Sequence, residues 1–233
     1  MIEIFELTKR YRGQAAVDGV SFRARPCRVT AFLGRNGAGK STTLRILLGL
    51  DHAGGGTATI DGRRYRDLPS PLRKVGALID GAGPLPERRA IDHLSWIART
   101  HGISRARIRE VLELTQLGEV GRQRTGKYSL GMRQRLGIAA ALLGEPEVLI
   151  LDEPVNGLDP DGIRWARRLM RDHAATGGTV LVSSHLMGEV AGTADDVVVI
   201  DHGRIVADGS LAEVTDGHPS LEAAFFALTD AQP

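Results

Sequence analysis

One glycine-rich segment constrains the fold of this chain more than any other feature. The residues Gly34-Arg-Asn-Gly-Ala-Gly-Lys-Ser41 follow the apolar run 29–33 and open a stretch with helical spacing. Glycines let successive backbone N–H groups point at an anion, and the first turn of a helix adds partial positive charge. A purely structural glycine turn would not need a lysine and a serine at these positions. The segment predicts a phosphate loop for a nucleoside triphosphate, with contacts from Gly34, Arg35, Asn36, Gly37, Ala38, Gly39, Lys40, Ser41 and Thr42.

A second motif places two acids at the end of an apolar run. Residues 148–151 are Val-Leu-Ile-Leu, and Asp152, Glu153 and Pro154 follow directly. Parallel α/β sheets bind their ligands at the carboxyl ends of the strands. In sites of this kind the loop lysine reaches the β- and γ-phosphates, and a hydroxyl and an acid hold Mg²⁺. We therefore expect Ser41 and Asp152 to hold Mg²⁺ and Glu153 to polarise the water that attacks the γ-phosphate.

Short apolar runs alternate with helix-length segments along the chain. The segments expected to be strands are 2–4, where Ile2 and Ile4 alternate with Glu3, and the runs 29–33, 75–79, 148–151, 180–183 and 197–200. The segments with apolar residues at three- and four-residue spacing, expected to be helices, are 41–50, 90–100, 105–115, 132–143 and 161–175. This alternation predicts an α/β fold with a mostly parallel sheet covered by helices. The region from about 81 to 144 has no strand pattern, which favours a helical insertion or lobe.

Composition excludes several classes of protein. The chain has 233 residues, 42% of them hydrophobic and 25% charged, which is typical of a globular protein and not of a disordered or collagen-like one. Its 30 Lys and Arg nearly balance its 28 Asp and Glu, so no net charge points to nucleic acid. The single Cys27 forms no internal disulfide and is expected to be a small buried thiol. The arginines at 105, 107 and 109 are expected on a solvated helix face.

No segment predicts a membrane span or a signal peptide. The longest stretch without Asp, Glu, Lys or Arg runs from His173 to Gly188 and is interrupted by Gly, Ser and His. Glu3 and Glu6 lie where a signal peptide would need an apolar run. We therefore expect a cytoplasmic protein.

Three further segments, together with the two motifs, resemble the ATP-binding cassette of membrane transporters. Tyr128-Ser-Leu-Gly-Met-Arg-Gln-Arg135 precedes the acidic strand, Asn156-Gly-Leu-Asp159 follows it, and Ser183-Ser-His185 ends the next strand. They are similar, in family order, to the signature sequence, the aspartate loop and the switch histidine. The resemblance covers nearly the whole chain. It implies a P-loop NTPase fold of the cassette type, with an N-terminal antiparallel β part and a helical subdomain.

The resemblance also implies that two cassettes pair head to tail with ATP between them. Asp159 would lie at the dimer interface, and His185 would contact the γ-phosphate and position the water with Glu153. Tyr11 is similar to the family's aromatic residue that stacks on adenine, and Val17 would pack beside it. The signature residues that would face the γ-phosphate held by the partner are Ser129, Leu130, Gly131 and Met132.

The chain departs from the family pattern at two places. Asp80 stands where the family usually has a glutamine that senses Mg²⁺, water and the membrane partner. A carboxylate still ligates Mg²⁺ but donates no hydrogen bond when ionised. The signature reads Tyr-Ser-Leu-Gly-Met in place of the commoner Leu-Ser-Gly-Gly-Gln.

The variant signature and the ending 220–229 resemble single-cassette ATPases of bacitracin- and daunorubicin-type export systems. This implies an ATP- and Mg²⁺-dependent subunit, peripheral on the inner face of the cell membrane. It would pair with a second cassette, favouring a homodimer, and power export through a separate integral membrane permease, without nucleic acid as partner. The implied organisation is a RecA-like core with the β part at 1–80 and 145–210, a helical signature lobe at about 81–144, and a C-terminal helical tail at 211–233.

Two other classes of function fit the sequence less well. A soluble regulatory or nucleic-acid-linked ATPase of the same superfamily would usually carry two cassettes or a long coiled-coil insertion, and this chain has neither. A GTPase would need an Asn-Lys-x-Asp segment, yet Asn36 and Asn156 are each followed by glycine. A small-molecule kinase would need neither the signature nor the switch histidine.

Overall fold

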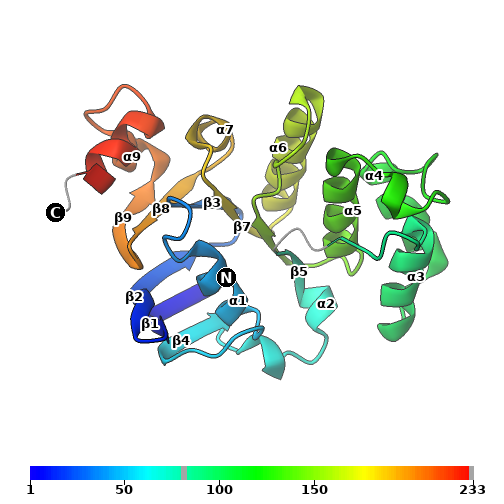
Figure 1. Cartoon of the computed structure of the whole chain (residues 1–233), viewed down its shortest axis with the longest axis horizontal. Helices are drawn as coiled ribbons and strands as arrows, with labels where there is room; N and C mark the ends of the chain where they lie inside the picture. The colour runs from blue at the N-terminus through cyan, green and yellow to red at the C-terminus, as the bar shows by residue number, and fades with distance from the viewer. Residues whose placement is uncertain (80–82, 231–233) are drawn as a thin grey trace.

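The computed structural model describes residues 1–79 and 83–230, which form two β-sheets flanked by helices (Figure 1). A three-stranded antiparallel sheet has the order β2-β1-β4, and a six-stranded sheet has the order β5-β6-β7-β3-β8-β9. All neighbours in the larger sheet are parallel except β8 and β9. The strands are β1 (Ile2–Tyr11), β2 (Gln14–Ala24), β3 (Arg28–Leu33), β4 (Gly55–Ile60), β5 (Val75–Leu78), β6 (Val148–Asp152), β7 (Thr179–Ser184), β8 (Asp196–Asp201) and β9 (Arg204–Ser210). The predicted α/β class is confirmed.

The two sheets share a hydrophobic core with helix α1 (Lys40–Leu47). Ile2 and Ile4 of β1 are buried on one face of the antiparallel sheet, as the two-residue period of a strand requires. The rings of Phe22 in β2 and Phe32 in β3 lie 4.9 Å apart between the sheets. Leu44 of α1 belongs to the same core. The phosphate loop is therefore held at both ends, because β3 and α1 are both anchored in this core.

Helices occupy most of residues 83–144, which we call the helical region. Figure 1 shows α3 (Ala90–Thr100), α4 (Arg105–Leu114) and α5 (Leu130–Leu142) grouped at the end of the molecule remote from the antiparallel sheet. Their apolar faces meet through Leu94, Ile108 and Leu136. The other helices are α2 (Pro71–Lys74), α6 (Pro160–Ala175), α7 (Met187–Ala191), α8 (Leu211–Thr215) and α9 (Leu221–Asp230), with 3₁₀ turns at Tyr65–Asp67 and Thr125–Lys127. None of the described helices combines the length and the apolar composition needed to cross a membrane.

The predicted helices at 90–100, 105–115, 132–143 and 161–175 form within two residues of the expected bounds. The predicted helix 41–50 ends earlier, at Leu47, and Gly49 just beyond it takes a left-handed conformation with φ 68°. Strands β2, β4 and β9 were not predicted. Strands β4 and β9 mix glycine and polar residues with few apolar ones, and in β2 the buried Val20, Phe22 and Ala24 alternate with polar residues and form no continuous apolar run.

Two predictions about individual residues are wrong. Cys27 is exposed, in a turn between β2 and β3 where its φ is 60°. Arg107 does not lie on a solvated face, because its guanidinium donates hydrogen bonds to the carbonyl oxygens of Leu142 at 2.8 Å and Leu143 at 3.4 Å. These carbonyls end α5 without partners in their own helix, and a cation is the favoured group there.

Candidate nucleotide site

The phosphate loop joins β3 to α1 through two closely packed glycines. Gly39, directly before α1, has a φ of 112°, which L side chains rarely adopt. A Cβ on Gly39 would lie 2.5 Å from the carbonyl oxygen of Ala16, and one on Gly34 would lie 2.5 Å from that of Ile200. The loop therefore passes so close to β2 and β8 that only glycine fits at both positions.

Lys40 is folded back over this loop. Its Nζ donates hydrogen bonds to the carbonyl oxygens of Gly34 at 2.6 Å and Arg35 at 3.2 Å. Burial lowers the pKa of Lys40, while the negative charges of Glu153 and Asp152 partly oppose the shift. A largely desolvated ammonium group within a loop at a helix N-terminus favours a polyphosphate anion.

The other predicted loop residues differ in their surroundings. Ala38 is buried, and its carbonyl oxygen accepts a hydrogen bond from Gly203 at 3.0 Å. Asn36 and Gly37 are exposed, and Thr42 is half-buried. The guanidinium of Arg35 pairs with Asp230 of α9 at 2.5 Å, so this side chain is held by the C-terminal helix.

Asp152 lies at the carboxyl end of β6 between two serine hydroxyl groups. Ser41, in the first turn of α1, donates to Asp152 Oδ2 at 2.9 Å, and Ser183 of β7 donates to Asp152 Oδ1. The strand order β6-β7-β3 brings these groups together, because β7 lies between the strand that carries the acid and the strand that leads to the loop. With an exposed fraction of 7%, Asp152 is buried yet satisfied by hydrogen bonds.

Glu153 follows in a strained backbone conformation, with a φ of 50°. Its N–H donates to the carbonyl oxygen and the hydroxyl of Ser183 at 3.2 and 3.1 Å. Its own carbonyl oxygen accepts a hydrogen bond from Gln134 Nε2 at 2.9 Å. The Glu153 carboxylate meets His185 Nδ1 at 2.9 Å, so the structure brings the predicted base and the predicted switch histidine together.

Tyr11 lies at the end of β1 in a polar cluster. Its ring is 45% exposed, and its hydroxyl donates a hydrogen bond to Asp51. Lys9 Nζ donates to the same carboxylate at 2.7 Å and lies 5.0 Å from the centre of the Tyr11 ring. Hydrogen bonds from Lys9 and then from Tyr11 hold the pKa of Asp51 at about 2. An exposed aromatic face fixed in this way is available to a flat ligand. Val17, by contrast, is buried in the core.

The predicted signature residues form the start of helix α5 in the helical region, with Ser129 as its N-cap. The Ser129 hydroxyl accepts a hydrogen bond from the Met132 N–H at 3.1 Å, and Leu130 is exposed. A Cβ on Gly131 would lie 2.9 Å from the carbonyl oxygen of Gly157. Asp159 caps α6 by accepting from the Gly162 N–H at 2.8 Å. Within residues 1–79 and 83–230, no hydrogen bond or ion pair joins the signature residues 129–132 to the phosphate loop.

The residues at the phosphate loop fit Mg²⁺ together with a polyphosphate. The Ser41 hydroxyl and the Asp152 carboxylate are hard oxygen donors that lie next to each other. Across the part of the chain that the structure describes, no three His, Cys, Asp or Glu side chains form a cluster that could hold a metal alone. Mg²⁺ commonly takes one or two protein oxygens and completes its shell with phosphate and water. Asp80, the third predicted ligand, lies outside the described residues.

The sequence analysis did not predict a role for three residues that the structure places in the site. Ser183 binds both Asp152 and the Glu153 backbone, Gln134 binds the Glu153 carbonyl, and Asp51 fixes Tyr11. Ser183 and Gln134 belong to segments that resemble family motifs, and this resemblance could have indicated that they lie at the site. Asp51 follows α1 with no motif of its own, so only the fold reveals its position beside Tyr11.

Comparisons with known proteins agree with this geometry. The family model described as ABC transporter matches residues 17–156. The chain is 40% identical to the bacitracin transport ATP-binding protein BcrA of Bacillus licheniformis over 211 residues, 89% of this chain and 69% of that protein. It is 36% identical to the lantibiotic transport ATP-binding protein SrtF of Streptococcus pyogenes over 227 residues, 97% of this chain and 96% of that protein.

A solved structure described as the ATP-binding subunit of an ABC transporter superimposes with a TM-score of 0.88 at 28% identity, covering 98% of this chain and 99% of that one. The family match includes the phosphate loop and the acidic strand, and these are the elements that the fold brings together around Lys40 and Asp152. The chain therefore belongs to the ABC transporter family, as an ATP-binding subunit with ATPase activity.

Proposed function

We propose that two copies of this chain, or this chain and a similar cassette, hydrolyse Mg-ATP between them and thereby drive export through a separate membrane permease. One observation carries the proposal: Ser41, Asp152, Glu153 and His185 meet at the carboxyl ends of β6 and β7, beside the phosphate loop. This arrangement contains a phosphate cradle, oxygen ligands for a cation, and a carboxylate paired with an imidazole.

Each residue has a distinct proposed part in the reaction. Lys40 and the loop N–H groups bind the β- and γ-phosphates, and Tyr11 stacks on the adenine. Ser41 and Asp152 hold Mg²⁺, which when bound supplies positive charge to the phosphate oxygens. Glu153 accepts a proton from the attacking water, and His185 keeps the carboxylate in place. Ser183 fixes the backbone that presents both acids.

A dimer completes the site. Ser129 and Gly131 lie at the N-terminus of α5, and among the described residues no hydrogen bond or ion pair joins residues 129–132 to the phosphate loop of the same chain. A helix N-terminus stabilises an anion, so a partner's α5 is suited to the γ-phosphate. Asp159, at the start of α6 in the loop that follows the acidic strand, would lie at this interface.

The permease and the direction of transport are inferred from the relatives. The proteins named for bacitracin and lantibiotic transport share more than a third of their aligned residues with this chain. We propose a peripheral position on the inner face of the membrane, with a drug, a peptide antibiotic or another hydrophobic compound as the exported substrate.

Two variants test the catalytic assignment. Lys40→Ala should lose ATP binding, because the buried ammonium is removed, while Lys127→Ala, at an exposed lysine of the helical region, should bind as wild type. Glu153→Gln should bind ATP, stop hydrolysing it and accumulate as an ATP-bound dimer in gel filtration, with Glu119→Gln as the control. Hydrolysis by Glu153→Gln at the wild-type rate would show that another group is the base.

A separate experiment tests the permease. The chain is tagged in its native cell, the membranes are solubilised in mild detergent, and the co-purifying proteins are identified by mass spectrometry. We expect a stoichiometric, highly apolar polypeptide. Recovery of the chain alone, or with ribosomes or nucleic acid, would support a regulatory ATPase and contradict transport.

A further inference from the structure

Charge is divided unevenly between the helical region and the rest of the chain. Residues 83–144 contain 11 Lys and Arg but only 5 Asp and Glu, whereas the remainder contains 19 and 23. A nearly neutral protein therefore has one strongly basic part. Charge asymmetry of this kind points to a specific anionic partner even when the overall charge does not.

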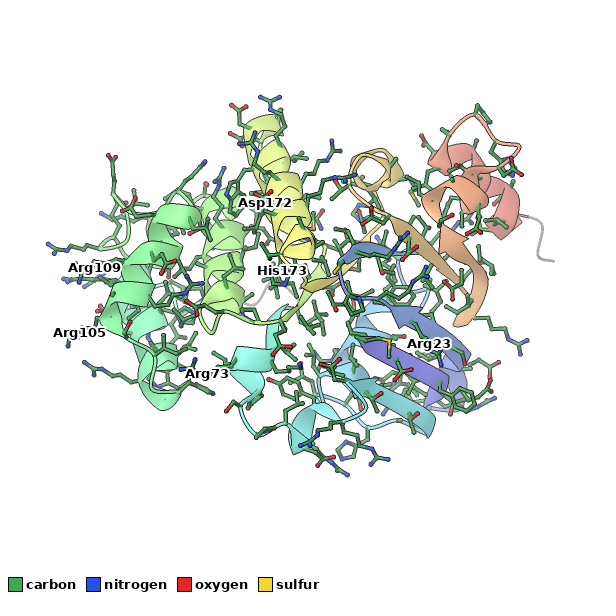
Figure 2. All side chains as sticks on the ribbon, turned by 180° about the vertical axis from the view of Figure 1, so that it is seen from behind. Arg23, Arg73, Arg105, Arg109, Asp172 and His173 are labelled. Carbon is green, nitrogen blue, oxygen red and sulfur yellow. The ribbon has the colours of Figure 1, made fainter. Side chains whose placement is uncertain are left out.

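Much of the excess is concentrated at one groove, which we call the α3–α4 groove. It has a volume of about 610 Å³ and lies between α3 and α4. Four arginines line it: Arg99 from α3, Arg105 and Arg109 from α4, and Arg122 from the loop that follows. Figure 2 shows Arg105 and Arg109 at the margin of the molecule, remote from the two sheets. Asp92 is the one acidic side chain in this lining.

Among the described residues, these four guanidinium groups have no partner. In the described part of the chain none of them makes an ion pair or a hydrogen bond through its side chain, and all four are exposed. Arg107, on the same helix, contrasts with them, because it pairs with Glu110 at 2.6 Å and caps α5. The sequence 105–109 thus contains one structural arginine between two that are free to bind an external anion.

A tryptophan is exposed in the same lining. Trp96 of α3 has an exposed fraction of 61%, and Arg88 lies 5.7 Å from the centre of its ring. Tryptophan and arginine are both enriched at the centres of interfaces, so an exposed indole ring in a groove lined by arginines is suited to contact with a partner. Tryptophan is the side chain that favours the boundary between water and lipid, because its ring is apolar and its N–H is polar.

We infer that the α3–α4 groove binds the surface of an anionic phospholipid membrane, with Trp96 inserted at the level of the headgroups. Clustered arginines bind phosphate strongly through charge-assisted hydrogen bonds. Basic residues near an anionic bilayer each add to binding, and an interfacial aromatic ring adds an apolar contact. The open lining, shared by two helices and a loop, suits several headgroups better than one extended acidic peptide, which would need a continuous track.

The inference extends the proposed peripheral location but is independent of the permease, because lipid contact alone would hold the chain at the membrane. Its test uses the purified full chain and vesicles, and ATP hydrolysis is measured in parallel without lipid. Loss of vesicle binding with normal hydrolysis would overturn this inference alone. A chain that fails to hydrolyse ATP would contradict the proposed function alone.

Flotation with vesicles is the decisive measurement. The chain should float with vesicles of equal parts phosphatidylcholine and phosphatidylglycerol, and not with phosphatidylcholine alone. Each arginine that is lost should weaken binding about fivefold, so the double variant Arg105→Gln, Arg109→Gln should bind about 25-fold more weakly. High salt should release the wild type, because it screens the attraction. The matched control is the double variant Arg63→Gln, Arg64→Gln, which removes the same charge and should bind as wild type. These two arginines are exposed and unpaired among the described residues but lie outside the helical region.

Fluorescence provides a second readout that depends on the ring itself. The chain has two tryptophans, so the variant Trp165→Phe leaves Trp96 as the sole tryptophan. Anionic vesicles should shift its emission to the blue, because the ring enters a less polar medium. Equal binding to neutral and anionic vesicles would overturn the inference. Binding to soluble polyglutamate but not to anionic vesicles would also overturn it, and would assign the groove to an acidic protein segment.

Discussion

Gln134 of helix α5 donates a hydrogen bond from Nε2 to the backbone carbonyl oxygen of Glu153, across 2.9 Å. Gln134 is buried, and it joins the helix that begins with the signature to the strand end that presents the acid. The bond matters because the Glu153 backbone has a φ of 50° and is held in that conformation by its neighbours. A movement of α5 within the helical region therefore acts directly on the position of the Glu153 carboxylate.

Replacing Gln134 should slow hydrolysis with little effect on ATP binding. Gln134→Leu keeps a similar volume but removes the donor, and one hydrogen bond contributes about 0.5 to 1.5 kcal/mol. We expect kcat to fall about threefold to tenfold with KM for ATP unchanged, measured by steady-state phosphate release. Gln123→Leu, at an exposed glutamine of the same region, is the control. A raised KM with normal kcat would contradict a role in positioning Glu153.

His185 should affect the chemical step for a different reason. Its Nδ1 lies 2.9 Å from the Glu153 carboxylate, so its removal frees the side chain of the proposed base. Because positioned acid–base groups contribute about 10² to 10⁴ in rate, His185→Ala should lose at least about 100-fold in kcat. Binding of a fluorescent ATP analogue should persist. Full activity in His185→Ala would exclude the pairing from the mechanism, and His218→Ala, at an exposed histidine, serves as the control.

The strands and helices that surround the phosphate loop could be predicted because each has a strong local pattern. Residues 148–151 and 180–182 are continuous apolar runs, which are typical of a strand buried on both faces. The phosphate loop is likewise a local feature, since its glycines, Lys40 and Ser41 are consecutive. These patterns predicted the parallel sheet, which the structure confirms, and the phosphate loop, whose binding of a triphosphate stays a prediction.

The contacts that connect separate segments could not be predicted in the same way. Tyr11 and Asp51 are 40 residues apart, and their hydrogen bond depends on how β1 packs beside the end of α1. Arg107 is surrounded in the sequence by the same kinds of residue as Arg105 and Arg109. Only the fold shows that it donates a hydrogen bond to the carbonyl oxygen of Leu142 at the end of α5. Cys27 is exposed because the turn between β2 and β3 places it there, whatever its intrinsic preference for burial.

The hydrogen bonds that Asp51 accepts should make the free energy of unfolding depend on pH in acid. Its pKa is about 2 in the folded chain against an ordinary 3.8, so the unfolded chain binds the proton more tightly. The stabilising contribution is therefore fully present above pH 3.8 and is lost as the pH falls through about 2. Asp51→Asn should be less stable than wild type above this window, and the difference should shrink inside it. The free energy of unfolding of both proteins can be measured by urea unfolding, followed by circular dichroism, at several pH values. Asp216→Asn, at an exposed aspartate, is the control. A difference between wild type and Asp51→Asn that stays constant down to pH 2 would contradict the prediction.

The contact between β5 and α5 should be among the most sensitive in the core. A Cβ on Gly76 of β5 would lie 2.1 Å from the carbonyl oxygen of Ala141, a backbone atom of α5 that a rotamer change cannot move. Gly76→Ala should therefore lower the free energy of unfolding by at least about 2 kcal/mol. Gly188→Ala is the matched control, because its Cβ would have no neighbour within 4 Å, and there we expect no loss or a gain of up to about 1 kcal/mol. Because α5 also carries Gln134, any Gly76→Ala protein that remains folded should hydrolyse ATP more slowly as the helix shifts away from Glu153. Wild-type stability of Gly76→Ala in urea would mean that β5 and α5 are not packed this closely.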